Sequence, residues 1–178
     1  MQTHELVAHP GHPPSRLSGI AASARVQGAW LTLRFRLENA GEVIVPPFAR
    51  IGRADGLWKR TCFELFLWHG EEEAYSEFNL SPSGQFAAYD FAAYRDGMQD
   101  RAMSRDPQCT WRPGGRLAIF DAAIPLAAIA EGGAIGLCAV IEEQGGTKSY
   151  WALGHPGGAP DFHHPACFAA QLPAPDAP

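Results

Sequence analysis

Lysine is nearly absent from this chain of 178 residues, which has only Lys59 and Lys148 and no cluster of basic residues. The formal net charge is −5. Because proteins contact nucleic-acid phosphates through grouped Lys and Arg side chains, we expect no nucleic-acid partner. No apolar run approaches the roughly 18 residues of a membrane-spanning helix, so we expect no membrane partner either.

Two further absences concern the cellular compartment. The first residues lack the unbroken apolar core of about 7 or more residues that marks a secretory signal peptide. The four cysteines are widely spaced and form no CxxC pair; they are Cys62, Cys109, Cys138 and Cys167. This pattern is typical of reduced thiols in a cytoplasmic protein, and it would look the same had a natural leader been removed.

Catalytic signatures are missing as well. The sequence has no GxSxG, P-loop, HExxH or dinucleotide-binding glycine fingerprint. We therefore expect no catalytic residue, no metal ion and no cofactor, and a protein without these features is more typical of a binding module than of an enzyme.

What the chain does contain is enough apolar residues for one core. Hydrophobic residues make up 46% and charged residues 19%, which is typical of globular rather than disordered chains. A chain of this length forms one domain of ordinary size and buries about 70% of its unfolded surface. We expect a single domain over residues 1–172, followed by a loose tail over residues 173–178.

Alternation of apolar and polar residues is clearest at residues 29–38, where Leu31 and Phe35 alternate with Arg34 and Arg36. Turn residues separate further alternating segments. Strands are predicted at residues 3–8, 20–27, 29–38, 42–45, 61–69, 74–80, 85–91, 116–124, 134–142 and 148–153, with a short helix at 125–130 and an irregular loop at 94–107. This pattern predicts an all-β fold: an antiparallel β-sandwich with jelly-roll character, about nine or ten strands and very little helix.

Some of these strands are apolar on both faces, which a sandwich tolerates only where an outer face is covered or carries a cleft. With a period of two, Glu64 shares a face with Phe66. If the next strand pairs with this one, Glu77 and Asn79 can lie on the same face. A carboxylate among apolar neighbours needs a partner, because an unpaired buried charge costs several kcal/mol. The pattern therefore indicates a ligand-binding face.

Paired carboxylates also have other roles. Glu64 and Glu77 could serve as acid and base in glycoside hydrolysis. Alternatively, they could be hydrogen-bonded carboxylates that hold a ligand or the sheet, and we favour this second interpretation because spacing alone does not fix the distance between two carboxylates.

A loop rich in Pro, Gly and His follows the last predicted strand. It contains Asp161, His163 and His164, which could bind a metal ion. The alternative, which we favour, is that these histidines hydrogen-bond backbone groups and fix the loop. His155 lies in the same loop.

Two tryptophans lie next to predicted strand ends. Trp58 precedes the strand of Glu64, and Trp151 ends the last strand. Lys59 and Lys148 are close to them in sequence. Aromatic rings and charged neighbours suit the apolar faces and the hydroxyls of a sugar, whereas the alternative is that both indoles plug the ends of the sandwich.

The residues WKRTCFE at positions 58–64, followed by YxEFNxSPxG at 75–84, resemble the DOMON-like and family 9 carbohydrate-binding-module superfamily. The residues from Trp151 to Phe168, which include PDFHHP, are similar to the end of those domains. The resemblance covers about two-thirds of the chain, residues 57–168, and the middle portion is the more specific. It implies an antiparallel β-sandwich, in agreement with the strand pattern.

The resemblance also implies a site. In the sugar-binding members two tryptophans clamp a saccharide, while acidic, basic and amide side chains bind its hydroxyls. Trp58, Glu64 and Trp151 match that pattern in relative position, and Glu77 and Asn79 match it more loosely. The Asp-rich loop of the family's calcium site is missing here.

Other members of the superfamily bind haem b through Met paired with His or Lys. Met98 and Met103 would be the candidates here, but no motif fixes an axial ligand. Sugar-binding modules of this kind are usually appended to secreted enzymes, whereas this chain stands alone, which makes it most similar to stand-alone bacterial DOMON-like proteins.

These observations favour a non-catalytic module that binds a small polar ligand, such as a carbohydrate or a glycoside-like compound. A haem b electron-transfer domain and an enzyme that uses the carboxylates or the His-rich loop stay open as alternatives. The sequence does not fix the oligomeric state. The predicted ligand-binding residues are Trp58, Lys59, Arg60, Glu64, Glu77, Asn79, Trp151, His155, His163 and His164.

Overall fold

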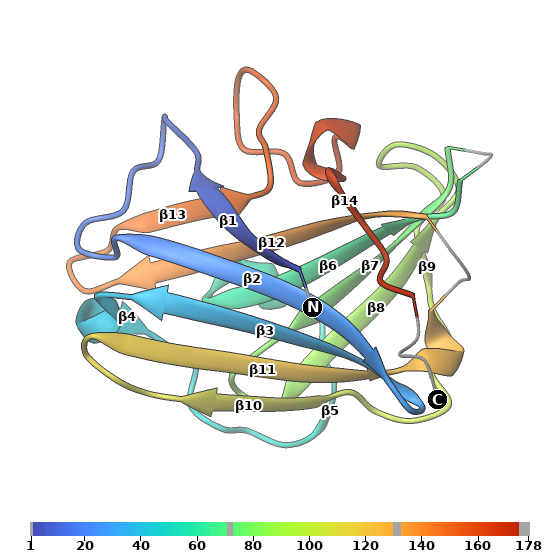
Figure 1. Ribbon diagram of the computed structural model, residues 1–178, viewed down its shortest axis with the longest axis horizontal. Coiled ribbons are helices and arrows are strands. Elements are labelled where there is room, and N and C mark those ends of the chain that lie inside the picture. The colour runs from blue at the N-terminus through green and yellow to red at the C-terminus, as the bar shows by residue number, and fades with distance from the viewer. Residues whose placement is uncertain (1, 71–72, 130–132, 175–178) are drawn as a thin grey trace.

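The computed structural model describes residues 2–70, 73–129 and 133–174. It is a curled sheet of 14 strands that folds over into two packed layers, as Figure 1 shows. Within the described residues the only helical elements are four short 3₁₀ turns: η1 (Ala40–Glu42), η2 (Leu57–Lys59), η3 (Leu126–Ala128) and η4 (Pro165–Cys167). The predicted all-β fold is therefore confirmed.

The first layer is entirely antiparallel and alternates strictly along its central strand. Its strands, in spatial order, are β10 (Gln108–Arg112), β11 (Leu117–Pro125), β3 (Trp30–Glu38), β2 (Gly19–Gln27) and β1 (Thr3–Ala8). In β3 the apolar residues Leu31, Leu33 and Phe35 are fully or almost fully buried, whereas Arg34 and Arg36 are exposed. This layer keeps one face on the core and one face in solvent.

The second layer holds Glu64, Glu77 and Asn79 in its middle strands. Its main strands, in spatial order, are β13 (Lys148–Ala152), β12 (Ala134–Glu143), β6 (Cys62–Trp68), β7 (Tyr75–Leu80), β8 (Gln85–Phe91) and β5 (Gly52–Arg53). Only the short pairing of β5 with β8 is parallel among the strand pairs of the described residues. Three two-residue strands flank this layer: β4 (Val43–Ile44) and β14 (Ala170–Gln171) pair with β12, and β9 (Gln99–Asp100) pairs with β8.

Strand β1 connects the two layers along one edge. Its first part, from Thr3 to Leu6, pairs with β2, and its end, Val7 and Ala8, pairs with β13. The sandwich is therefore closed on this side by a strand that belongs to both halves.

The core between the layers is aromatic and aliphatic. Phe63 of β6 stacks on Phe120 of β11 with ring centroids 4.1 Å apart, and Phe35 of β3 lies 4.9 Å from Phe63. All three side chains are fully buried. Burying side chains of this kind contributes about 1.5–3 kcal/mol each relative to exposure, so these contacts hold the layers together.

A second apolar cluster covers the outer face of the second layer. Phe66, Tyr75 and Phe91 point to this side and pack with Phe162 and Cys167 of the C-terminal loop. In Figure 1 this loop and η4 lie over the second layer, on the side away from the first. The strands that are apolar on both faces thus have a covered outer face, as the sequence predicted.

Four strands were not predicted: β5, β9, β10 and β14. Three of them have only two residues, which is too short to show an alternating pattern. Strand β10 does alternate, with Cys109 and Trp111 partly buried between exposed polar residues, and this signal was missed. The strand count of nine or ten is accordingly too low. The short helix predicted at 125–130 is the 3₁₀ turn η3, with residue 130 outside the described residues, and the predicted tail at 173–178 extends into residues 175–178, which also lie outside them.

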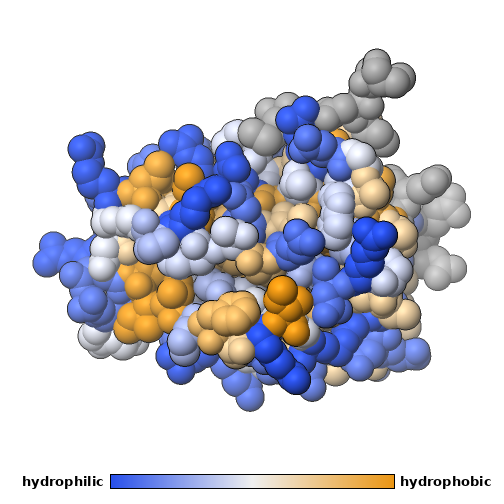
Figure 2. Space-filling model, turned by 90° about the horizontal axis from the view of Figure 1, so that it is seen from below, coloured by the Kyte–Doolittle hydropathy of each residue, from blue (hydrophilic) through white to orange (hydrophobic). Residues whose placement is uncertain are grey.

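The outer surface carries apolar side chains in separate patches. Figure 2 shows orange patches on the face seen from below, divided by hydrophilic side chains. Phe48 and Ile51, in the segment before β5, are 72% and 60% exposed. Scattered exposure of this kind is normal for a folded protein. No helix in the described ranges is long and apolar enough to cross a membrane.

Candidate functional site

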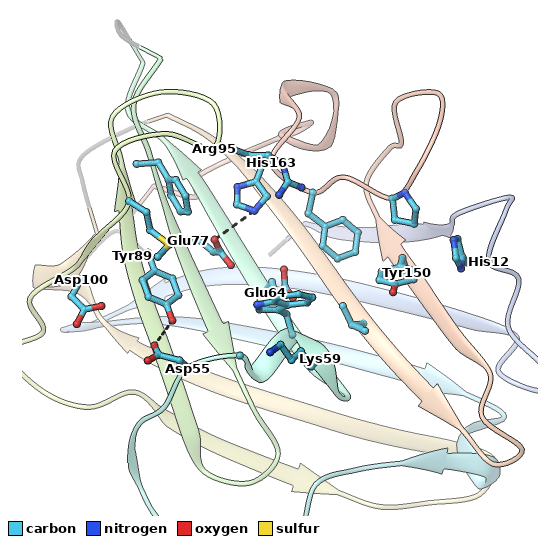
Figure 3. A pocket seen from close by; sticks show the side chains of 17 residues that line it. His12, Asp55, Lys59, Glu64, Glu77, Tyr89, Arg95, Asp100, Tyr150 and His163 are labelled. Atoms are coloured by element: carbon cyan, nitrogen blue, oxygen red, sulfur yellow. Dashed lines mark hydrogen bonds and ion pairs between the residues drawn. The ribbon is translucent and has the colours of Figure 1, made fainter.

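A cavity of about 880 Å³ opens on the outer face of the second layer. Its floor is formed by side chains of β6, β7, β8, β12 and β13, and its walls are formed by η2 and by the loops around His12, Arg95 and Pro160. Figure 3 shows Glu64 and Glu77 in its middle, with Tyr89 and Asp55 to one side and Tyr150 and His12 to the other. This volume is in the range of small-molecule sites.

Glu64 lies on the central strand β6, where it pairs with Asn79 of β7 and Cys138 of β12. Strand alternation points its side chain to the cavity, together with Phe66. The residue is 3% exposed, and its Oε1 atom has no hydrogen-bond partner. Burial, with a further contribution from the nearby Glu77, raises the pKa of the Glu64 carboxyl well above its ordinary value.

Glu77 lies two residues before Asn79 on β7 and therefore faces the same side. The prediction that Glu64 and Glu77 share one face is confirmed. Asn79 donates from Nδ2 to Glu77 Oε1 at 2.7 Å, and His163 Nε2 lies 3.8 Å from Glu77 Oε2. Burial raises the pKa of the Glu77 carboxyl, although the Asn79 hydrogen bond and the charge of Arg95 lower it.

His163 is held in one orientation by its neighbours. The hydroxyl of Tyr75 accepts from the backbone N–H of Arg95 at 3.1 Å and lies 2.7 Å from His163 Nδ1. The hydroxyl can donate to Nδ1 or accept from it, and in the tautomer in which Nδ1 accepts, the ring proton lies on Nε2, toward Glu77. Burial and the charge of Arg95 lower the pKa of His163 to about 4, so the ring is neutral at pH 7.

Arg95 is fixed by the C-terminal loop. Its guanidinium donates to Asp161 at 2.7 Å, and Tyr94 donates to the same carboxylate. These donors hold the pKa of Asp161 below its ordinary value. Arg95 has a backbone φ of 54°, a left-handed conformation that is unusual for a residue other than glycine and that concentrates at functional sites.

The open side of the cavity carries Trp58 and Lys59 of η2. Gly56, just before this turn, has a φ of 69°, which glycine adopts without steric cost. Trp58 is 52% exposed, and the Lys59 ammonium lies 5.7 Å from its ring centroid. Trp58 therefore offers an aromatic face to solvent beside the buried carboxyls.

The two side walls are also aromatic. On one side Tyr89 of β8 donates its hydroxyl to Asp55 at 2.6 Å. On the other side Tyr150 of β13 packs edge-on against His12 at 5.0 Å and near Phe162 at 6.2 Å. The site thus combines carboxyl groups with several aromatic faces, and such groups suit a small polar ligand with an apolar face.

Trp151 does not reach this cavity. It is 4% exposed, belongs to the core between the two layers and donates from Nε1 to Ser149 at 2.9 Å. The predicted clamp of two tryptophans is therefore wrong for Trp151. Its indole packs inside the sandwich, which is closer to the alternative that the indoles are structural. Tyr150, its neighbour in β13, points to the opposite face and lines the cavity in its place.

The other predicted residues divide into two groups. Lys59, Glu64, Glu77 and His163 line the cavity with Trp58. The remaining four do not line it: Arg60 pairs with Glu142 at 2.6 Å, Asn79 binds Glu77, His155 lies 2.8 Å from the Val7 carbonyl, and His164 accepts from the Ala166 N–H. The prediction that His163 and His164 hydrogen-bond backbone groups holds for His164 and is wrong for the His163 ring, which contacts the Tyr75 hydroxyl and Glu77.

The two methionines of the haem alternative are separated. Met98 lines the cavity and is 60% exposed, whereas Met103 packs against the core. Among residues 2–70, 73–129 and 133–174, no group of three or more His, Cys, Asp or Glu side chains is placed to hold a metal ion. Asp161, His163 and His164 do not form such a group because each is engaged with different partners.

Several lining residues were not expected from the sequence: Asp55, Tyr89, Phe91, Arg95, Tyr150 and Phe162. Tyr89 and Phe91 lie on the same face of β8 by alternation, so the parity of that strand was a usable signal. Arg95 lies in an irregular loop, where no periodic pattern exists to place it.

The comparisons bear on the fold. A solved structure of a "putative carbohydrate-binding protein" from Bacteroides uniformis ATCC 8492 superposes with a TM-score of 0.64 over 96% of this chain and 85% of that chain. The sequence identity is 16%, so the likeness establishes a similar fold. No protein-family model and no curated protein matches the chain.

Proposed function

We propose that this chain is a non-catalytic module that binds a small polar ligand, of the carbohydrate or glycoside class, in the cavity over β6 and β7. The observation that carries the proposal is the buried Oε1 atom of Glu64, which has no hydrogen-bond partner although the cavity opens beside it. Leaving a buried polar group unsatisfied costs about 1–3 kcal/mol, and more for a charged group. A hydrogen-bond donor of a ligand at this position would remove that cost.

The roles follow from the geometry. Glu64 and Glu77 accept hydrogen bonds from ligand hydroxyls at the bottom of the cavity. His163 supplies an Nε2–H donor beside Glu77, and Lys59 supplies a donor at the open side. Trp58, half exposed at the opening, packs its ring on an apolar face of the ligand.

Two further findings support this proposal. The similar structure from Bacteroides uniformis carries a carbohydrate-binding description. The motif at residues 58–84 resembles the DOMON-like and family 9 carbohydrate-binding-module superfamily, in which acidic and aromatic side chains bind sugars. We therefore place the chain, as a proposal, among modules of that kind, with a single tryptophan at the site.

A thermal-shift screen tests the proposal, because a ligand that binds only the native state raises its stability. Mono- and disaccharides, aryl glycosides and haem are compared on the intact chain. We expect a sugar or glycoside to raise the melting temperature, and calorimetry to give a Kd that Trp58→Ala weakens by about 2 kcal/mol or more, as for a buried aromatic anchor. Trp68→Ala is a control, since Trp68 is exposed on β6 outside the cavity.

If no sugar or glycoside shifts the melting temperature, or if Trp58→Ala binds as tightly as the parent, the proposal fails. The two negative results can be told apart: the first rejects sugars and glycosides as ligands, and the second rejects the contact of Trp58 with the ligand.

A haem site is the second candidate, since Met98 and His163 line the same cavity. The surroundings of His163 disfavour it. Its ring lies 5.1–5.7 Å from Phe91, Phe66 and Tyr75, and both ring nitrogens face protein partners. A visible spectrum after haem addition decides: a sharp Soret band that Met98→Ala abolishes would favour haem over the sugar-class ligand.

The two carboxyls also suit an enzyme, because a carboxyl with a raised pKa can act as a general acid in glycoside hydrolysis. Incubation with aryl glycosides tests this directly. Turnover that Glu64→Gln and Glu77→Gln both abolish would replace the binding module with a hydrolase, whereas binding without turnover supports the module.

A further inference from the structure

The charges that line the cavity are unequal. Four carboxyl groups line it, those of Asp55, Glu64, Glu77 and Asp100, whereas the lining cations are Lys59 and Arg95. The cavity is therefore acidic if every group carries its usual charge.

Both lining cations have other partners, although the charge of Arg95 also lowers the pKa of the Glu77 carboxyl. Arg95 donates to Asp161, which lies outside the lining, and the Lys59 ammonium lies over the ring of Trp58. Within the described part of the chain, neither Glu64 nor Glu77 makes an ion pair with Lys or Arg. His163 faces Glu77 but is neutral at pH 7.

The outer carboxyls differ in this respect. Asp55 accepts the Tyr89 hydroxyl at 2.6 Å, and Asp100, which is strongly exposed, lies 3.7 Å from the Arg53 guanidinium. Among the four lining carboxyls, Glu64 and Glu77, at the bottom of the cavity, are thus the two that have neither a hydroxyl donor nor an Arg or Lys partner within the described residues.

The remaining titratable groups near this pair add no positive charge at neutral pH. Cys62 and Cys138 flank Glu64 from β6 and β12, and burial raises the pKa of both thiols, so they stay protonated. Tyr75 and Tyr89 also have raised pKa values, and His12 lies at the far wall beside Tyr150.

Aromatic faces surround the carboxyl pair. Trp58, Phe91, Tyr150 and Phe162 all line the cavity. An aromatic face attracts a cation through its quadrupole, and this attraction grows as water is excluded. Carboxyls enclosed by aromatic faces are thus the environment that a protonated amine prefers.

From this arrangement we infer that the ligand carries a protonated amine on a polyhydroxylated framework, such as an amino sugar, with its ammonium group between Glu64 and Glu77. The inference rests on the proposed function and narrows its ligand class. The hydroxyls of the framework reach Lys59 and His163, and its apolar face packs on Trp58.

Binding of such a ligand is coupled to a proton. A carboxyl that retains its proton in the empty cavity loses it when the ammonium arrives, and the proton passes to the buffer. The ammonium keeps its own proton, so the bound state is an ammonium–carboxylate pair with charge-assisted hydrogen bonds. A neutral sugar has no charge to exchange and binds without this release.

The test uses matched pairs of sugars on the intact chain: D-glucose, D-galactose and D-mannose against their 2-amino analogues, with the N-acetyl forms as uncharged controls. Calorimetry is run from pH 5 to pH 7 in two buffers of different ionisation enthalpy, so that proton release is measured directly. We expect at least one amino sugar to bind about tenfold or more tightly than its neutral parent and its N-acetyl form, with proton release to the buffer.

Glu64→Gln removes the titrating carboxyl with little change in shape, and we expect it to abolish both the preference for the amine and the proton release. Glu38→Gln is the matched control, because Glu38 is exposed on β3 in the other layer and far from the lining. A neutral parent that binds as tightly as its amine overturns this inference and leaves the sugar-binding proposal standing. If no sugar of either kind binds, both are overturned.

Discussion

The outer faces of the two layers show how differently one fold can place charges. On the first layer, Arg34 donates to Asp121 at 2.7 Å, Arg112 donates to the same carboxylate, and the groups are half exposed. On the second layer, Glu64 is buried without a partner for Oε1. Charged groups on a solvated face cost little free energy, so ion pairs there are no sign of a binding site.

A third carboxylate shows that burial alone is not the distinguishing feature. Glu143 at the end of β12 is 1% exposed, but it accepts the backbone N–H groups of Ser15, Arg16 and Leu17 at 2.7, 2.7 and 2.9 Å. Its burial fastens the loop between β1 and β2. The Oε1 atom of Glu64 has no such partner, and this difference is the reason why we propose that Glu64 contacts a ligand.

The largest expected effect separates core from site. We expect Trp151→Ala to lower the free energy of unfolding by about 3–5 kcal/mol, because a fully packed indole leaves a cavity between the layers. Trp58→Ala should lower it by less than about 1 kcal/mol, since that ring is half exposed. Denaturant unfolding of both variants measures this. Equal losses of unfolding free energy in the two variants would contradict the assignment of Trp151 to the core and of Trp58 to the surface.

The second effect tests the contrast between two buried carboxyls. Glu143→Ala should cost about 2–4 kcal/mol, because three backbone N–H groups lose a charged acceptor. Glu142→Ala, one residue earlier, loses only exposed ion pairs with Arg60 and Lys148 and should cost less than about 1 kcal/mol. Urea denaturation at pH 7 compares the two, and similar costs would contradict the fastening role of Glu143.

A smaller effect depends on pH. Because the folded-state pKa of Glu64 is raised, the native chain holds a proton that the unfolded chain has released, so stability falls as pH rises from the ordinary carboxyl pKa to the folded one. Glu64→Gln removes this dependence. We expect the variant to match the parent at about pH 4 and to become relatively more stable as pH rises.

This comparison is made as a difference between variant and parent, since Asp161, with its lowered pKa, contributes a dependence of the opposite sign to both. Thermal unfolding over the pH series supplies the data. A difference between the two proteins that stays constant with pH would mean that folding leaves the pKa of Glu64 unchanged.

The smallest effect belongs to the solvated face. Asp121→Asn breaks the contacts with Arg34 and Arg112, and we expect a change of about 1 kcal/mol or less that shrinks further in 0.5 M salt. Equilibrium unfolding with and without added salt checks it. A loss of unfolding free energy as large as that of Glu143→Ala would show that exposed and buried carboxylates contribute equally to stability here.

Much of the fold could be predicted because the long strands alternate. The bounds of β1 and β8 agree with the sequence pattern, and most others agree within one or two residues. The short strands β5, β9 and β14 could not be found, since two residues carry no period. Their pairing is decided by neighbouring strands and not by their own residues.

The same reasoning predicts only some of the residues of the site. Glu64 and Glu77 follow from parity within two adjacent strands, and Trp58 from its position before β6. For Trp151 parity could not decide, because Tyr150 and Trp151 are adjacent aromatic residues and either one could have faced the core. Arg95 depends on a left-handed backbone position in a loop, which no periodicity predicts.

The shared strand β1 has a kinetic consequence. Val7 and Ala8 pair with Ala152 and Trp151, and the His9 N–H donates to the Tyr150 carbonyl at 2.8 Å, so this edge joins segments from nearly opposite ends of the described chain. Such closure must overcome the entropy of a very long loop before any contact stabilises it, and folds dominated by distant pairings reach the native state in roughly milliseconds to seconds. We therefore expect the wall formed by His12 and Tyr150 to be completed late in folding.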